Sequence, residues 1–370
     1  TPLYSSAASD VYKRQVPGSM PNMIFEKLCK EQVIFDQNKQ KLNRNVKIFI
    51  NYFLGPVLFV WISVSLYNQV KQQPDLPGAW QQIKQAFYGA NSWKLWVGLL
   101  LMPLNWGLEA YKWYFLVNKL QPISFAKAFE SVLSGLSLAM NTPNRIGEYG
   151  GRIVYLQEEN RLKGVALTLV SSVGQLLVTL ACGFVALLLL KSDLHPVQLD
   201  GNHLSGILLQ VFVWSVLFFT LLTALFFFRM QLLAKMLQWV PRLKEKLLFV
   251  NVLDRLSNNT YYTILFYSFL RFVVFALQYV LIWQALQINL PWWEGFWSVA
   301  LIFLIMAIVP SFAIADVGIR GKVAIGILAL FSTNTLAILS GSVLVWLLNL
   351  VLPALIGSLL LLSIKIFKER

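Results

Sequence analysis

The sequence contains few of the residues that build soluble domains and their active sites. Only 13% of its 370 residues are charged, whereas about 25% is typical of a soluble domain. It has two histidines and two cysteines, with no CxxC spacing and no disulfide framework. A P-loop and a Gly-x-Ser-x-Gly nucleophile elbow are also missing. We therefore expect no soluble catalytic domain, no metal site, no cofactor and no enzymatic activity.

Long apolar segments dominate the chain instead. Hydrophobic residues make up 57% of the sequence, and the mean hydropathy is +0.61. Non-alternating runs of roughly 18 or more such residues match the thickness of a bilayer core and exclude the alternating pattern of a membrane barrel. We predict an all-α polytopic membrane protein with about six full spans. These are expected at residues 48–67, 93–117, 164–190, 206–228, 260–286 and 338–364.

The formal net charge of +14 comes mainly from Lys and Arg between the apolar runs, which favours membrane topology over nucleic-acid binding. Nineteen of these cations from residue 20 onward fall in segments expected inside the cell, and three fall in segments expected outside. This asymmetry predicts that both termini are cytoplasmic. Residues 20–47 then form a basic cytoplasmic segment and 365–370 a cytoplasmic tail, whereas residues 1–19 are expected to be a non-native leader.

Two regions interrupt the apolar pattern, and we call them the first broken unit (residues 124–156) and the second broken unit (residues 292–331). Each is expected to return to the side of the membrane from which it came. The sequence does not separate a re-entrant hairpin from a pair of short helices. Polar backbone at membrane depth must lie against protein or a wet cavity.

Both broken units contain an acid-x-Gly-x-Arg motif. Its residues are Glu148, Gly150 and Arg152 in one copy and, 168 positions later, Asp316, Gly318 and Arg320 in the other. Pro143 and Pro310 precede the two acids by five and six positions. The order of spans around each unit also agrees, so residues 48–190 and 206–364 are predicted to be inverted-topology repeats, typical of transporters. Two structural kinks with similar caps are the alternative.

The residues around each motif suit a helix start inside the membrane. Thr142 is expected as an N-cap with Pro143 at the first helical position, and Ser311 after Pro310 is a less clear equivalent. A free helix N-terminus favours an anion. Gly147 and Gly150 thin one helix face, which allows close packing of helices or approach of a ligand.

Charges near the motifs suggest an anionic ligand. Glu148 and Arg152 are four residues apart and can pair, as can Asp316 and Arg320. With Arg145 and Arg271 the surplus is positive, and an arginine fork can bind phosphate through two hydrogen bonds. Interhelical pairing or snorkelling remains open for each of these side chains. Asn105, Glu109 and Lys112 fall within two turns of the second predicted span, and Glu109 and Lys112 are interpreted by preference as residues of the cytoplasmic interface.

Three segments resemble one known family. "TPNRIGEYGGRIVYL", "VPSFAIADVGIRGKVA" and "NWGLEAYKWYFL" are similar to hallmark segments of the lysylphosphatidylglycerol synthase transmembrane-region family, and the likeness covers about residues 48–364. Many members have Gly-Val-Arg-Glu where this chain has Gly-Ile-Arg-Gly at positions 318–321. Asp316 is a candidate replacement for the missing acid.

The resemblance implies a flippase-like domain, as in multiple peptide resistance factor proteins, located in a bacterial inner membrane. We predict a translocase for an anionic or aminoacylated phospholipid or a related lipid-linked phosphate. Arg152 and Arg320 would contact the phosphate, and Glu148 and Asp316 would orient these arginines or exchange protons. The expected partners are membrane phospholipids and, as a candidate, a separate lipid-modifying synthase, but no nucleic acid. A non-transporting partner of such a synthase and a membrane enzyme acting on a lipid phosphate are the alternatives.

Overall fold

The computed structural model describes most of the chain from position 76 onward. The described residues are 60, 64, 76–140, 142, 145–190, 203–230, 252–253, 256–309 and 313–362, without the side chains of 313–316 and a few others. All belong to one unit, Leu54–Ile364. The expected basic segment 20–47, nearly all of the span 48–67 and the tail 365–370 lie outside the described residues.

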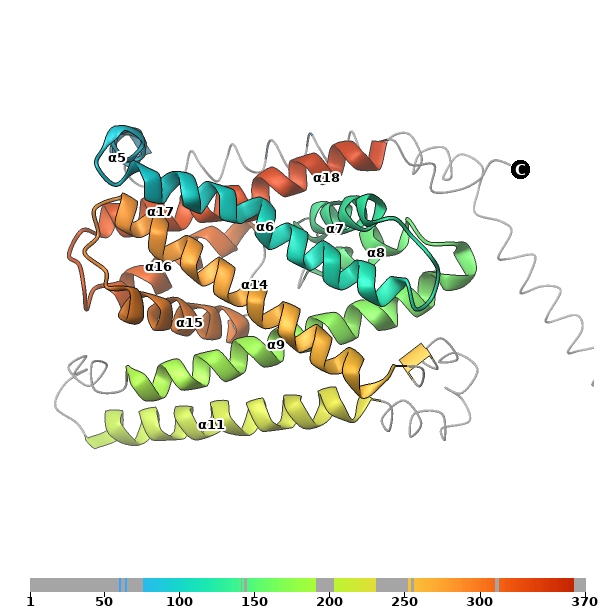
Figure 1. The fold of residues 1–370 in the computed structure, drawn as a ribbon. Coiled ribbons are helices and arrows are strands. Elements are labelled where there is room, and N and C mark those ends of the chain that lie inside the picture. Colours follow the sequence, from blue (N-terminus) through green and yellow to red (C-terminus); the bar gives the residue numbers. More distant parts are fainter. Residues whose placement is uncertain are drawn as a thin grey trace, which may run out of the picture. The chain divides into compact units, whose positions relative to one another are not determined.

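Every regular element in the described part of the chain is helical (Figure 1). The first half contributes α5 (Leu76–Tyr88), α6 (Ser92–Val117), α7 (Phe125–Met140), α8 (Gly147–Ile153), the short η2 (Glu158–Asn160) and α9 (Arg161–Leu189). The second half contributes α11 (His203–Phe228), α14 (Asn258–Ala285), α15 (Trp292–Ile308), α16 (Ala313–Leu328), α17 (Thr335–Trp346), the π-helical η4 (Leu347–Val351) and α18 (Leu352–Leu362). The predicted all-α class is confirmed for these residues.

Four segments are long and apolar enough to cross a membrane. They are Glu158–Leu189, Ile207–Phe228, Asn258–Ala285 and Thr335–Leu361, and each overlaps a predicted span. The predicted span 93–117 forms α6, whose 26 residues would extend about 39 Å at 1.5 Å per residue. The chain is therefore a multi-pass membrane protein, while the full number of six spans stays a prediction.

The broken units are pairs of helices. In the first, α7 and α8 pack against each other and the helix breaks between Met140 and Gly147. In the second, α15 and α16 are in contact and the break follows Ile308. Each acid-x-Gly-x-Arg motif lies in the helix that follows its break. Each unit stands between longer helices in the same order, which agrees with a repeat, but the inverted orientation remains a prediction.

The start of α8 differs from the prediction. Residue 143 is not its first helical position, because α8 begins at Gly147 with Ile146 at the cap position. The Thr142 hydroxyl still accepts a hydrogen bond from the Gly147 N–H, at 2.7 Å, and its own proton faces carbonyl oxygens at the end of α7. Thr142 therefore ties the two helices together across the break instead of capping a helix one residue later. Pro143, Pro310 and Ser311 lie outside the described residues.

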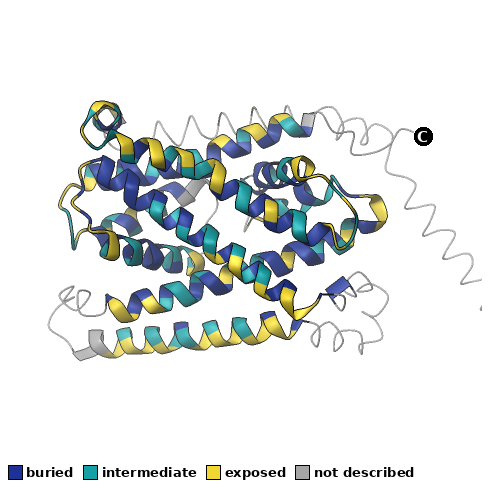
Figure 2. Ribbon diagram, viewed as in Figure 1, coloured by how far each residue is buried: buried dark blue, intermediate teal, exposed yellow. Residues whose placement is uncertain are grey.

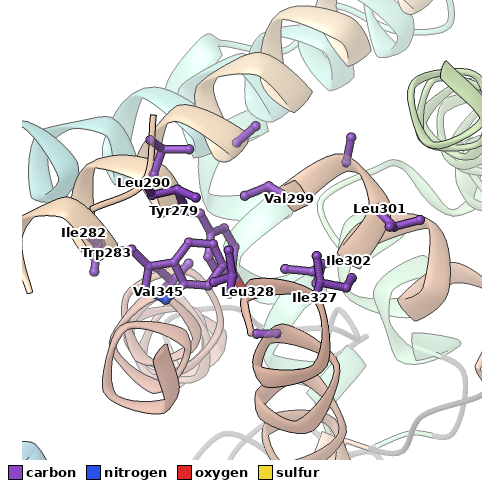
Figure 3. Close-up of a cluster of buried hydrophobic side chains, with 14 of the residues drawn as sticks. Tyr279, Ile282, Trp283, Leu290, Val299, Leu301, Ile302, Ile327, Leu328 and Val345 are labelled. Carbon is purple, nitrogen blue, oxygen red and sulfur yellow. The ribbon is translucent and has the colours of Figure 1, made fainter. Parts of the chain in front are cut away.

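The interior contains two large hydrophobic clusters, and both draw residues from the two halves of the chain. One gathers residues of α14–α17 with the end of α9, and Figure 3 shows Tyr279 and Trp283 at its centre beside Val345 and Leu328. The other joins α6, α7 and the first part of α9 with residues of α11, α14 and α18. Helix α11 packs on α9 and exposes large apolar side chains on its remaining surface (Figure 2), including Trp214 and Phe218. Because nothing else in the described part of the chain covers this surface, it suits contact with lipid.

Candidate functional site: an arginine-lined cavity

A cavity of about 300 Å³ lies between the two broken units. Three arginines line it: Arg145 from the first break, Arg271 from α14 and Arg320 from α16. The rest of its wall is largely apolar and aromatic. These other lining residues are Ala139, Met140, Thr142, Gln175, Thr179, Phe272, Phe275, Phe303, Met306, Ala307, Trp346 and Leu350. Segments far apart in the sequence thus place three cations around one space of headgroup size.

Arg145 holds an unusual backbone conformation at the break. Its φ of 58° lies in the left-handed region, which is uncommon for residues other than glycine. Its side chain is 53% exposed, and its Nη2 lies 3.8 Å from Glu148 Oε2. This loose pairing leaves the guanidinium accessible from the cavity.

Glu109 lies at the centre of a buried cluster of charges. Its Oε2 is 2.9 Å from Lys112 Nζ and 3.0 Å from Arg271 Nη1, and its Oε1 is 2.7 Å from Arg152 Nη2. The Glu109 side chain is 4% exposed. A buried carboxylate surrounded by three cations is compensated for its desolvation, but the cations exceed what one carboxylate can neutralise. We call Glu109, Lys112, Glu148, Arg152 and Arg271 the charge cluster.

Arg152 sits within this cluster behind the cavity wall. Its Nη2 donates to Glu148 Oε1 as well as to Glu109, and its guanidinium lies 5.5 Å from the centre of the Trp113 ring. The four-residue pairing of Glu148 with Arg152 is therefore present. Arg152 is buried and is not one of the residues that line the cavity. Its predicted contact with phosphate stays a prediction, and its observed partners are the two carboxylates and the Trp113 ring.

Neutral polar side chains continue the network from the charge cluster toward the second half. Arg271 Nε donates to Asn105 Oδ1 at 2.9 Å, and Asn105 Nδ2 donates to Asn349 Oδ1 at 3.2 Å. Asn349 Nδ2 donates to Gln278 Oε1 at 2.7 Å, and Gln278 Nε2 donates to the Gly98 carbonyl at 2.9 Å. Asn349 lies in the π-helical segment η4, a type of irregularity often found at functional sites. The chain of bonds joins α6, α14 and η4.

The second motif meets a different environment. Arg320 Nη1 donates to the Tyr279 hydroxyl at 3.0 Å, and Arg320 is only partly buried. A side chain at Gly318 would meet no other atom within 4 Å. Lys322, two residues further along α16, is exposed. The side chain of Asp316 lies outside the described residues, so its predicted pairing with Arg320 stays a prediction.

A comparison with protein-family models gives one match. Residues 76–357 match the model described as the lysylphosphatidylglycerol synthase TM region. The chain belongs to this family. A search of curated proteins found no match. The family match includes both acid-x-Gly-x-Arg motifs, the charge cluster and all the residues that line the cavity.

In this family member, glycines bring α7 and α8 together. A Cβ atom on Gly147 would lie 2.2 Å from the Leu138 carbonyl oxygen, and one on Gly151 would lie 2.5 Å from the Gly135 Cα. A Cβ on Gly150 would meet only Leu138 Cδ1, at 3.9 Å. Gly147 and Gly151 thus serve close packing of α7 and α8, the helix from which Arg152 reaches Glu109 of α6.

Glu109 and Lys112, interpreted from the sequence as interface residues, do not face the protein surface, and neither does Asn105. All three are buried and bonded to side chains of α14, α8 or η4. Their spacing of four and three residues, which places them on one helix face, was the signal that could have identified them. Asn349 carried a weaker signal, as a single amide in an apolar run. Among the described residues, no group of His, Cys, Asp and Glu side chains could hold a metal ion.

Proposed function

We propose that the chain is a lipid translocase that moves an anionic or aminoacylated phospholipid, or a related lipid-linked phosphate, between leaflets. The observation that carries the proposal is the cavity to which both broken units contribute an arginine, Arg145 and Arg320, with Arg271 of α14 between them in the sequence. Guanidinium groups are suited to phosphate because they donate several hydrogen bonds in a fixed plane. The aromatic and aliphatic remainder of the wall suits the start of the acyl chains.

Within this function the charged residues divide into two roles. Arg145, Arg271 and Arg320 would contact the headgroup phosphate from the cavity wall. Glu109 and Glu148 would fix Arg271, Arg152 and the start of α8, since these are their observed partners. Asp316 would act on Arg320 from one turn earlier in α16.

Transbilayer movement of fluorescent lipids in reconstituted vesicles tests the proposal. Arg320→Ala should slow headgroup movement about tenfold or more, because a desolvated charge contact to phosphate is lost. Lys322→Ala is the matched control, since this lysine lies on the same helix but is exposed. Equal rates for wild type and Arg320→Ala would remove the cavity from the mechanism.

Translocation requires no covalent step, so we also propose that the chain is not an enzyme. Mass spectrometry of the lipids after prolonged incubation with purified protein should find their headgroups unchanged. A lipid product that forms only with the protein would instead favour the membrane-enzyme alternative.

We propose a bacterial inner-membrane location with both termini in the cytoplasm, supported by the distribution of Lys and Arg along the sequence. A cysteine introduced at Glu159, an exposed position between the first broken unit and α9, should react with a membrane-impermeant thiol reagent only after the cytoplasmic side is opened. Labelling in intact cells would reverse the orientation. Copurification would reveal a separate lipid-modifying synthase as a partner.

A further inference from the structure

The charges around the cavity do not balance. Five cations belong to the cavity wall or the charge cluster: Arg145, Arg271, Arg320, Arg152 and Lys112. The described carboxylates among them are Glu109 and Glu148. Even when Asp316, one turn before Arg320 in the sequence, is counted as ionised, five cations face three carboxylates and two positive charges remain uncompensated.

This surplus lies in surroundings that make it costly. Arg152 and Lys112 are buried, Arg271 is 18% exposed, and the cavity wall beside Arg271 is built from Phe272, Phe275 and other apolar side chains. A charge in a membrane interior is unfavourable unless a partner neutralises it. A bound group with two negative charges would neutralise the surplus fully, whereas a group with one would leave half of it.

We propose that the cavity selects a lipid whose headgroup is a dianionic phosphate, such as a phosphomonoester or a diphosphate, over phospholipids with a single charge. A phosphomonoester carries about −1.5 to −2 charges near pH 7, and a phosphodiester such as phosphatidylglycerol carries one. An aminoacylated headgroup adds an ammonium group to three arginines, so the same surplus disfavours it. This inference rests on the proposed function and narrows its substrate class.

The three arginines that line the cavity can bind the additional charged oxygen of a dianionic phosphate. Arg145 and Arg320 come from opposite broken units, and the guanidinium of Arg145 is only loosely paired with Glu148, at 3.8 Å. Arg271 already gives Nη1 to Glu109 and Nε to Asn105, which leaves its Nη2 for the ligand. A phosphate with three terminal oxygens can accept from all three guanidinium groups at once, whereas a diester has two such oxygens.

Calorimetric titration of the purified full chain in detergent tests the selection. The probes are dioctanoyl phosphatidic acid, dioctanoyl phosphatidylglycerol and soluble glycerol 3-phosphate. Phosphatidic acid shares its acyl chains with phosphatidylglycerol and its phosphomonoester with glycerol 3-phosphate. Phosphatidic acid should bind about tenfold or more tightly than phosphatidylglycerol near pH 7, as expected for one additional desolvated charge contact. Glycerol 3-phosphate should bind more weakly than phosphatidic acid, because it lacks acyl chains.

Two substitutions connect the preference to the cavity. Arg145→Gln removes one cation that is half exposed, so the fold should tolerate it, and it should reduce the preference for phosphatidic acid severalfold. Lys322→Gln removes an equal charge from the exposed side of α16 and should leave the preference unchanged. A preference that responds equally to both substitutions would reflect net charge alone and overturn the inference.

The remaining outcomes separate the inference from the proposed function. Equal binding of the two lipids, weakened in both cases by Arg320→Gln, would overturn the dianion preference and leave the cavity as a headgroup site. Lipid binding that neither Arg145→Gln nor Arg320→Gln changes would overturn both. Glycerol 3-phosphate binding as tightly as phosphatidic acid would show a site for a free phosphate and would also overturn the lipid assignment.

Discussion

Arg152 and Arg320 end the same motif in the two broken units, yet their surroundings differ. Arg152 is buried between Glu109 and Glu148, whereas Arg320 is partly buried, lines the cavity and donates to the Tyr279 hydroxyl. Tyr279 follows Glu109 by 170 positions, close to the 168 that separate the arginines. The central helices α6 and α14 thus supply a carboxylate to one motif and a phenol to the other. The arginine with a carboxylate partner is buried, and the arginine with a phenol partner lines the cavity.

The largest expected effect on stability concerns Glu109, the shared carboxylate partner of Arg152 in the first broken unit. Glu109→Gln leaves Lys112, Arg152 and Arg271 without their shared carboxylate, and breaking a buried ion pair costs about 3–5 kcal/mol. We expect a strong fall in the thermal unfolding temperature of the protein in detergent. Glu159→Gln, at an exposed position, is the control and should change stability by no more than about 0.5 kcal/mol. Equal stability of the two variants would contradict the anchoring role of Glu109.

Two glycines, one in a helix of each broken unit, should respond to alanine in opposite directions. Gly147→Ala places a Cβ 2.2 Å from the Leu138 carbonyl oxygen and should destabilise the protein by about 1–3 kcal/mol through overpacking. Gly318→Ala meets no atom within 4 Å and should stabilise α16 by about 0.5–1 kcal/mol, because alanine loses less conformational entropy in a helix. Thermal unfolding of both variants measures the difference. A stabilised Gly147→Ala variant would show that α7 and α8 do not pack this closely.

A smaller effect is expected for the phenol of the second unit. Tyr279→Phe removes the hydroxyl that accepts from Arg320, and a lost hydrogen bond costs about 0.5–1.5 kcal/mol. The fall in unfolding temperature should be well below that of Glu109→Gln. The rate of lipid movement in vesicles should nevertheless fall clearly, because Arg320 loses its orientation at the cavity. A fall in unfolding temperature as large as that of Glu109→Gln would show that the bond between Arg320 and Tyr279 stabilises the fold as much as the Glu109 ion pairs do.

The smallest stability effect is expected at the loosest ion pair. Arg145 Nη2 and Glu148 Oε2 are 3.8 Å apart, and the Arg145 side chain is half exposed. Such a pair contributes about 0–1 kcal/mol, so Arg145→Gln should unfold at nearly the wild-type temperature. Circular dichroism during heating provides the measurement, and a large loss of stability would assign Arg145 to the fold instead of the cavity.

Local patterns in the sequence predicted much of this architecture. The apolar runs predicted four spans that the structure contains. The two interruptions of the apolar pattern predicted the positions of the helix pairs α7–α8 and α15–α16. The four-residue spacing of Glu148 and Arg152 also predicted their pairing. These features depend on residues close in sequence, so propensity and spacing are sufficient to find them.

The long-range part of the site could not be predicted in the same way. Glu109 meets Arg152 and Arg271 across 43 and 162 positions, and no local pattern specifies which face of α6 turns toward α14. The same spacing of Asn105, Glu109 and Lys112 would suit a snorkelling stripe at the interface. Thr142 and Pro143 predicted an earlier helix start, but α8 begins at Gly147. This start depends on the close contact between α8 and α7, which local sequence patterns do not specify.

The π-helical segment η4 has a consequence for how the last span is shared. A π-helical turn contains an additional residue, and each residue of a helix advances the side-chain direction by about 100°. The part before the segment, α17, packs against α16, while the part after it, α18, packs against α7. A Cβ on Gly357 of α18 would lie 2.0 Å from the Leu133 carbonyl oxygen of α7, so this contact is intimate. One continuous span thus packs against a helix of each broken unit, and the π-helical segment η4 lies between the two contacts.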